Sequence, residues 1–173
     1  MVAEQLRRRE AIRASYRPAR VRMLFVGESP PASGRFFYSR DSGLYRALLD
    51  AFHLADKSIA DENFLEAFRD AGCYLIDACL QPVDRMESSA RRAACLDGES
   101  HLARSFRTFQ PETIVSLVHS IRANVERAAE RARWKGILVA VPYPGRWIQH
   151  RKVFLTSLVP HLRVLLASKE ARS

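Results

Sequence analysis

Short apolar runs alternate with amphipathic stretches along most of the chain. The apolar runs are rich in β-branched residues and are each followed by a loop, as buried strands are; they occupy residues 21–26, 75–76, 113–118 and 136–141. Stretches with apolar residues at helical spacing cover residues 43–52, 62–71, 99–109, 120–133 and 147–166. This alternation predicts a three-layer α/β/α fold, whose central, mostly parallel sheet has about four strands and carries helices on both faces.

The first twenty residues have a different pattern. Residues 4–16 mix arginine with glutamate and predict a polar helix, and residues 17–20, which include Pro18, predict a linker. We therefore expect a basic N-terminal helix and linker over residues 1–20 and one domain over residues 21–173. The helix is expected to serve either as a DNA-binding arm or as a solvated lid on the fold.

Composition narrows the classes of protein to consider. Hydrophobic residues make up 47% and charged residues 27% of the chain, which is typical of globular proteins. No apolar run approaches the roughly 20 residues that cross a bilayer, and the N-terminus lacks the apolar core of a secretory signal. These features exclude a membrane partner and predict a cytoplasmic protein, associated with the nucleoid of a bacterium.

The formal net charge is +9, and arginine supplies most of the positive charge. Arginine bonds phosphate bidentately and stays charged, so the excess suits a nucleic-acid partner, although a GC-rich genome enriches arginine too. The three cysteines have no zinc-site spacing and are too few to hold an iron-sulfur cluster. We expect buried thiols, no bound metal and no other cofactor.

Ligands bind at the carboxyl ends of the strands in open parallel sheets, so the loops after the strands are where chemistry is expected. The first loop offers Gly27, Glu28 and Ser29 before two prolines that stiffen it, and Phe37 follows shortly after. Asp77 ends the second strand. Each feature has a plain structural alternative, since the first loop can be a tight turn and Asp77 can cap the turn that follows.

The loop after the last strand combines prolines, a glycine, aromatic rings and cations. Its residues are Pro142, Tyr143, Pro144, Gly145, Arg146 and Trp147, with Arg151 and Lys152 close behind. Such a loop suits a surface that contacts a phosphate backbone and wedges into a base stack. An exposed structural loop is the alternative.

Taken in order, these loops resemble the motifs of the uracil-DNA glycosylase superfamily from residue 21 onward. The resemblance rests on Gly27-Glu28-Ser29-Pro30, Gly34-Arg35-Phe36-Phe37, Asp77 and Pro142-Tyr143-Pro144-Gly145-Arg146. The first motif is nearest to the Gly-Glu-Ala-Pro type branch, without the iron-sulfur cysteines of that branch.

The resemblance implies a role for each residue. Glu28, Ser29 and Tyr143 are the catalytic candidates, with Glu28 positioning water. The flipped base is expected to contact Gly27, Phe37 and Asp77. The DNA-binding candidates are Pro144, Gly145, Arg146, Trp147, Arg151 and Lys152.

Three positions depart from the family pattern. Ser29 stands where several branches have Asp or Asn, and Tyr143 stands where the last motif has His. Asp77 stands where the family has Asn, whose amide both donates and accepts hydrogen bonds. An ionised Asp77 only accepts and so favours a base edge with two donors, such as guanine N1–H and N2–H or a protonated cytosine-like edge, whereas a protonated Asp77 imitates Asn.

The resemblance implies a DNA base-excision glycosylase that flips out a deaminated or damaged base, uracil or a related one, and hydrolyses its N-glycosidic bond. The alternative is a catalytically inactive member of the superfamily that binds nucleic acid or a nucleobase. The expected partner is single- or double-stranded DNA, and the expected oligomeric state is a monomer.

Overall fold

Four parallel strands form the centre of the computed structural model, which describes residues 2–145 and 147–170. The strands are β1 (Met23–Gly27), β2 (Cys73–Asp77), β3 (Thr113–Ser116) and β4 (Ile137–Ala140). Their order in the sheet is β2-β1-β3-β4, and every neighbouring pair is parallel. The chain therefore moves outward from β1 to β2 and then crosses back to the other side of β1, which confirms the predicted parallel sheet of four strands.

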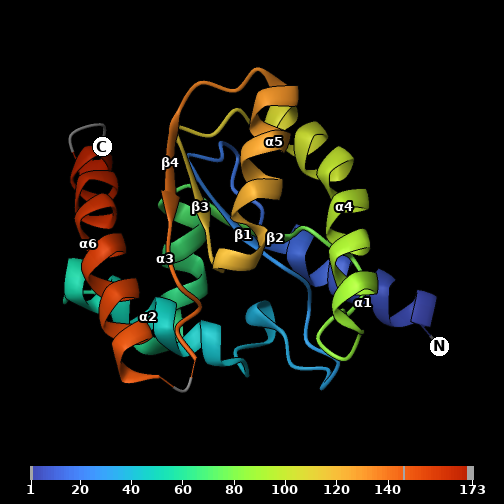
Figure 1. The fold of residues 1–173 in the computed structure, drawn as a ribbon. Coiled ribbons are helices and arrows are strands. Elements are labelled where there is room, and N and C mark those ends of the chain that lie inside the picture. The colour runs from blue at the N-terminus through green and yellow to red at the C-terminus, as the bar shows by residue number, and fades with distance from the viewer. Residues whose placement is uncertain (1, 146, 171–173) are drawn as a thin grey trace.

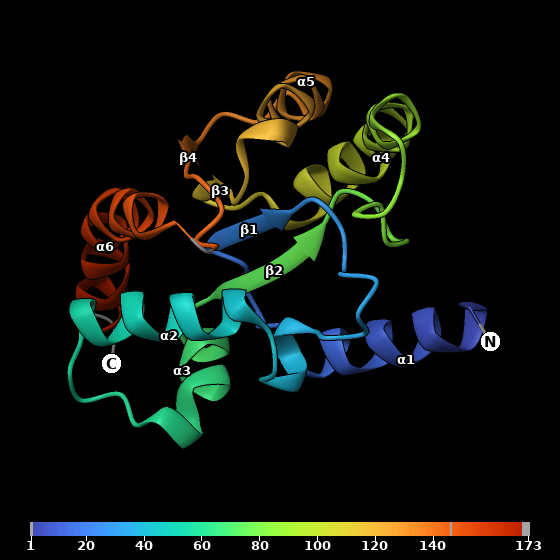
Figure 2. The ribbon, with the colours of Figure 1, turned by 60° about the horizontal axis from the view of Figure 1, so that its bottom comes forward.

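Helices cover both faces of this sheet (Figure 1). They are α1 (Val2–Ser15), α2 (Gly43–Ala55), α3 (Phe64–Asp70), α4 (Ser88–Phe109), α5 (Arg122–Ala132) and α6 (Ile148–Glu170). Figure 2 shows α4 and α5 on one face and α2 and α3 on the other, with α6 beside α2. This is the predicted three-layer α/β/α arrangement. Within the described residues, no helix is both long enough and apolar enough to span a bilayer.

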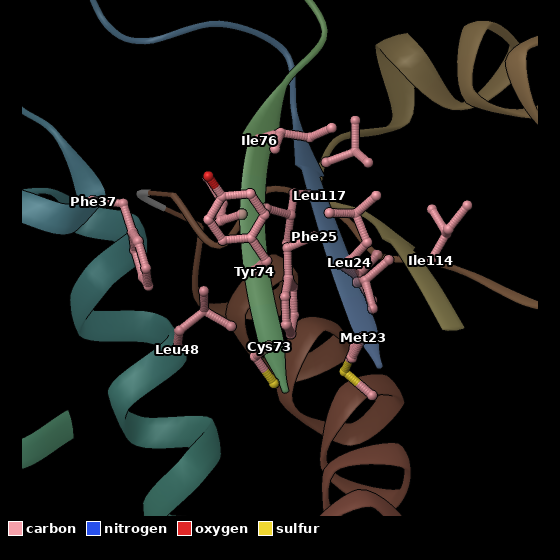
Figure 3. Close-up of a cluster of buried hydrophobic side chains, with 14 of the residues drawn as sticks. Met23, Leu24, Phe25, Phe37, Leu48, Cys73, Tyr74, Ile76, Ile114 and Leu117 are labelled. Atoms are coloured by element: carbon pink, nitrogen blue, oxygen red, sulfur yellow. The ribbon is translucent and has the colours of Figure 1, made fainter. Parts of the chain in front are cut away.

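The core is continuous on both sides of the sheet because β1, β2 and β3 are buried along their whole length. Figure 3 shows Phe37 and Leu48 on one side of β1 and β2, with Leu24 and Ile114 toward the other. On the α3 side, the ring of Phe25 packs 5.4 Å from that of Phe68. Burial on both faces is what the unbroken apolar runs of the sequence require.

Helix α4 is longer than its sequence pattern predicts, since it begins at Ser88 rather than near residue 99. Its buried residues are Cys95, Glu99, Leu102, Ala103 and Phe106. A charged residue therefore interrupts the apolar stripe, and the turns before it contain mostly serine, alanine and arginine. Apolar periodicity alone cannot detect such a helix.

Glu99 joins α4 to α5 through a buried ion pair. Its Oε1 accepts hydrogen bonds from Asn124 Nδ2 and Arg127 Nε, both at 2.9 Å, and Arg131 Nη2 lies 3.1 Å from Oε2. Burial acts to raise the pKa of Glu99, but the hydrogen bonds from Arg127 and Asn124 outweigh it and lower that pKa below its ordinary value. The ionised form is therefore favoured in the fold.

We expect Glu99→Gln to lower the free energy of unfolding at neutral pH by about 1–3 kcal/mol, because charged hydrogen bonds are lost from a buried site. Folding lowers the pKa of this carboxyl group, so its charge stabilises the fold at any pH above the pKa that it has in the unfolded state. That stability is lost as the pH falls through the pKa of the folded state. Urea unfolding should therefore show the difference shrinking below about pH 4.5. Glu126→Gln, on the exposed Arg122–Glu126 pair, is the control and should change stability by less than about 0.5 kcal/mol. Equal losses of stability in Glu99→Gln and Glu126→Gln would contradict a stabilising role for the buried Glu99 carboxylate.

Candidate functional site

A cavity of about 330 Å³ opens at the carboxyl end of β1. Its walls come from the loop after β1, the end of β2, the residues after β3 and the loop after β4. Because strand order reverses at β1, this is the topological switch point where open parallel sheets bind ligands. The cavity brings together all six residues predicted to bind or act on a base; these are Gly27, Glu28, Ser29, Phe37, Asp77 and Tyr143.

One wall of the cavity is aromatic and firmly packed. Phe37 is only 3% exposed, and its ring meets that of Tyr38 edge to face at 4.9 Å and lies 5.2 Å from that of Phe68. Phe36 also lines the cavity. Rings held this way form a fixed apolar surface of the kind against which planar ligands pack.

Asp77 reaches the cavity across the end of β1. Gly27 and Asp77 are register partners in the β1–β2 pair. A Cβ atom at position 27 would lie 2.7 Å from Asp77 Oδ1, closer than packed atoms come. Glycine is therefore required at position 27 to leave room for the Asp77 carboxylate beside the strand.

The N-terminal helix supplies the counter-charge for this carboxylate. Arg13 Nη2 of α1 donates a hydrogen bond to Asp77 Oδ2 at 2.6 Å, and both side chains are less than a tenth exposed. The Arg13 guanidinium also lies over the Phe36 ring and bonds Glu10. Sequence reasoning missed Arg13, because one arginine among several in a polar helix carries no sign that it is buried.

Burial and the ion pair act on the protonation of Asp77 in opposite directions. Burial is the larger effect, so the pKa of Asp77 is raised above its ordinary value even though the charge of Arg13 opposes that rise. The carboxylates of Asp77 and Glu10 in turn raise the pKa of Arg13 against the effect of its own burial. Arginine stays charged in proteins, so its contact favours the ionised carboxylate. We therefore treat Asp77 as a hydrogen-bond acceptor only.

Glu28 is held by a second arginine that sequence reasoning missed. Arg91 of α4 donates to both oxygens of the Glu28 carboxylate, with Nε 2.8 Å from Oε1 and Nη2 in contact with Oε2. Ser120 Oγ also donates to Oε1, at 3.3 Å. Arg91 lies in the part of α4 that the apolar pattern fails to predict, and this explains why it was overlooked.

The other two catalytic candidates occupy different parts of the cavity. Ser29 Oγ accepts a hydrogen bond from the backbone N–H of Val83 at 3.2 Å and so joins the loops after β1 and β2. Tyr143 is 45% exposed and lines the cavity from the loop after β4. Ser29 therefore has a structural contact, whereas Tyr143 offers a hydroxyl between cavity and solvent.

The DNA-binding candidates that the structure describes lie outside the cavity lining, in the loop after β4 and in the first turns of α6. Trp147 and Lys152 are exposed, Gly145 donates its N–H to the Tyr143 carbonyl, and Pro144 is buried. Arg151 bonds Asp50 of α2. Arg146 lies outside the described residues.

Comparison with known proteins identified no family and no similar curated protein for this chain. Its likeness to uracil-DNA glycosylases stays an expectation from its motifs. A function is therefore inferred from the chemistry of the cavity.

Thiol and metal chemistry have little support in the described part of the chain. No cluster of three or more His, Cys, Asp or Glu side chains there is placed to hold a metal ion. Cys79 and Cys95 lie near the site, with their Sγ atoms 3.7 Å apart, and both are buried. Burial raises the pKa of Cys79 to about 12, which leaves little reactive thiolate at neutral pH.

Arg13→Met should destabilise the protein by about 3–5 kcal/mol at neutral pH, because it leaves the Asp77 carboxylate buried without its counter-charge. Without Arg13, the pKa of Asp77 in the folded state lies further above its pKa in the unfolded state. The loss of stability should therefore shrink as the pH falls below the folded-state pKa, because the carboxyl group then protonates. Urea unfolding across pH is the measurement.

Adding Asp77→Asn should restore much of that stability, since a neutral amide replaces the unpaired charge. The exposed Arg8→Met on the same helix is the control and should cost less than about 0.5 kcal/mol. Lack of rescue in the Arg13→Met/Asp77→Asn double variant would show that Arg13 stabilises the fold by other contacts.

Proposed function

We propose that this protein is a DNA glycosylase, which takes a deaminated or damaged base into the cavity and hydrolyses its N-glycosidic bond. The supporting observation is that the six residues predicted to bind or act on a base line one cavity at the switch point of the sheet, although they come from four places in the chain: residues 27–29, 37, 77 and 143. Its volume of about 330 Å³ is at the lower end of the roughly 300–1,000 Å³ typical of small-molecule sites.

The cavity suits a base that presents N–H groups. Asp77, ionised by its contact with Arg13, accepts hydrogen bonds and repels carbonyl oxygens. Guanine and its damaged derivatives that keep N1–H and N2–H present two adjacent donors, whereas uracil presents one donor between two carbonyls. Phe37 gives the flat ring an apolar surface. The proposal therefore favours damaged guanine over uracil.

The loop after β4 and the start of α6 support contact with DNA. Trp147 is 71% exposed and Ile148 86% exposed, and the exposed Lys152 is one turn of α6 beyond Ile148. An exposed apolar pair beside a cation can enter the base stack while the cation contacts phosphate. The same loop reaches the cavity through Tyr143.

In the proposed reaction, Glu28 orients a water molecule toward C1′ of the flipped nucleotide. A bond forms between the water oxygen and C1′ as the bond from C1′ to the base nitrogen breaks, and the electron pair leaves with the base. The Glu28 carboxylate takes the proton released by water, and the Tyr143 hydroxyl donates a hydrogen bond to the departing base.

A second candidate function is binding of a base without catalysis. The observation that favours it is the double contact of Arg91 with the Glu28 carboxylate, to which Ser120 adds a third hydrogen bond. A carboxylate that already accepts three hydrogen bonds has fewer lone pairs left to accept one from water. The two functions share the same cavity and differ only in the role of Glu28.

The first test is incubation with duplex and single-stranded oligonucleotides that contain uracil, hypoxanthine, xanthine, 8-oxoguanine or normal bases, followed by alkaline cleavage of abasic sites. We expect cleavage at a lesion and a loss of rate of about 100-fold or more in Glu28→Gln. Glu130→Gln, exposed on α5, is the control and should retain the full rate.

The outcomes separate the two functions. Gel-shift binding without any cleavage would favour the inactive binder. Neither cleavage nor binding would contradict both candidates. Full activity in Glu28→Gln would remove Glu28 from the reaction.

Base preference provides a second test. The Arg13→Met/Asp77→Asn double variant replaces the acceptor-only carboxylate with an amide that also donates, so its binding should shift toward uracil relative to guanine by about tenfold or more. Titration of both proteins with deoxyuridine and deoxyguanosine measures the shift. An unchanged ratio of affinities would show that Asp77 does not contact the base.

A further inference from the structure

A second cavity, of about 540 Å³, lies beside the first between α4 and α5. We call it the arginine groove and define it by its polar lining, which is Glu28, Ser88, Arg91, Arg92, Ser120, Asn124 and Arg127. Glu28 and Arg91 line both cavities. The two cavities are therefore neighbours, separated by a single ion pair.

The groove keeps a positive charge after its ion pairs are counted. Arg91 is balanced by Glu28, and Glu99 contacts both Arg127 and Arg131. Arg92, exposed on α4, also lines the groove. Three arginines line the groove, and the carboxylates of Glu28 and Glu99 pair with two of them, which leaves the charge of Arg92 to attract an anion.

The paired arginines still have donors to offer. Arg91 and Arg127 each hold their carboxylate through Nε and Nη2, so Nη1 takes no part in either pair. A guanidinium has five N–H groups in a fixed plane, and it can therefore bond a carboxylate on one edge and a second anion on another. Hydroxyl groups of Ser88 and Ser120 line the same space.

We propose that the arginine groove binds a phosphate of the nucleotide whose base occupies the central cavity. The inference rests on the proposed function in placing a base next to Phe37 and Asp77. The shared wall at Glu28 and Arg91 puts the groove beside that base, and phosphate is the anion that arginine clusters bind best. The phosphate belongs either to a polynucleotide backbone or to a free mononucleotide.

Calorimetric titration at low salt tests the proposal with five probes, namely deoxyguanosine, its 5′- and 3′-monophosphates, inorganic phosphate and a short single-stranded oligonucleotide. At least one monophosphate should bind about tenfold or more tightly than the nucleoside, because a charge-assisted contact is added. Arg92→Glu should abolish that gain and leave nucleoside affinity unchanged. The control, Arg104→Glu, reverses a charge at another exposed position of α4 and should keep the gain.

Equal affinities for the nucleoside and both monophosphates would overturn the proposal, as would equal effects of Arg92→Glu and Arg104→Glu. If deoxyguanosine fails to bind, the contact of a guanine edge with Asp77 fails, whereas the cleavage assay above tests the proposed function itself. Inorganic phosphate then tests the groove alone: binding that Arg92→Glu abolishes supports it, and no binding overturns it. If a monophosphate binds more tightly than the nucleoside, the oligonucleotide identifies the source of the phosphate. Much tighter binding of the oligonucleotide than of the monophosphate indicates a polynucleotide backbone, and equal binding of the two indicates a free nucleotide.

Discussion

The buried pair between Arg13 and Asp77 is the interaction on which the site depends. It ties α1, at the start of the chain, to the last residue of β2, and it holds the Asp77 carboxylate in the wall of the cavity. Gly27 makes the arrangement possible, because a side chain there would collide with the carboxylate. Buried ion pairs add little net stability, so a functional reason for this one is the more economical explanation.

A second constraint brings Glu28 and Arg91 together. Arg91 belongs to α4, which packs so closely on the loop after β2 that a Cβ atom at Gly98 would lie 2.3 Å from the Ala78 carbonyl oxygen. That approach lets Arg91 reach across to the loop after β1. The same pair forms the wall between the two cavities, so the packing of one helix shapes both binding spaces.

The fold could be predicted from the sequence, and so could the gathering of the candidate residues around one cavity, because unbroken apolar strands and the loops after them follow general rules of parallel sheets. The six cavity residues all belong to such loops or strand ends. The arginines that complete the site could not be predicted in the same way. Arg13 and Arg91 lie on helices with weak apolar periodicity, and their partners are distant in sequence, so only the folded structure reveals the pairs.

The central claim is that a base enters the cavity with its N–H edge on Asp77. A crystal structure of the Glu28→Gln variant with an oligonucleotide containing 8-oxoguanine tests it most directly. We expect the damaged base to lie outside the base stack, with its ring against Phe37 and its N1–H and N2–H directed at the Asp77 carboxylate. A base that stays stacked in the DNA, or that enters with a carbonyl edge toward Asp77, would overturn this placement of the base.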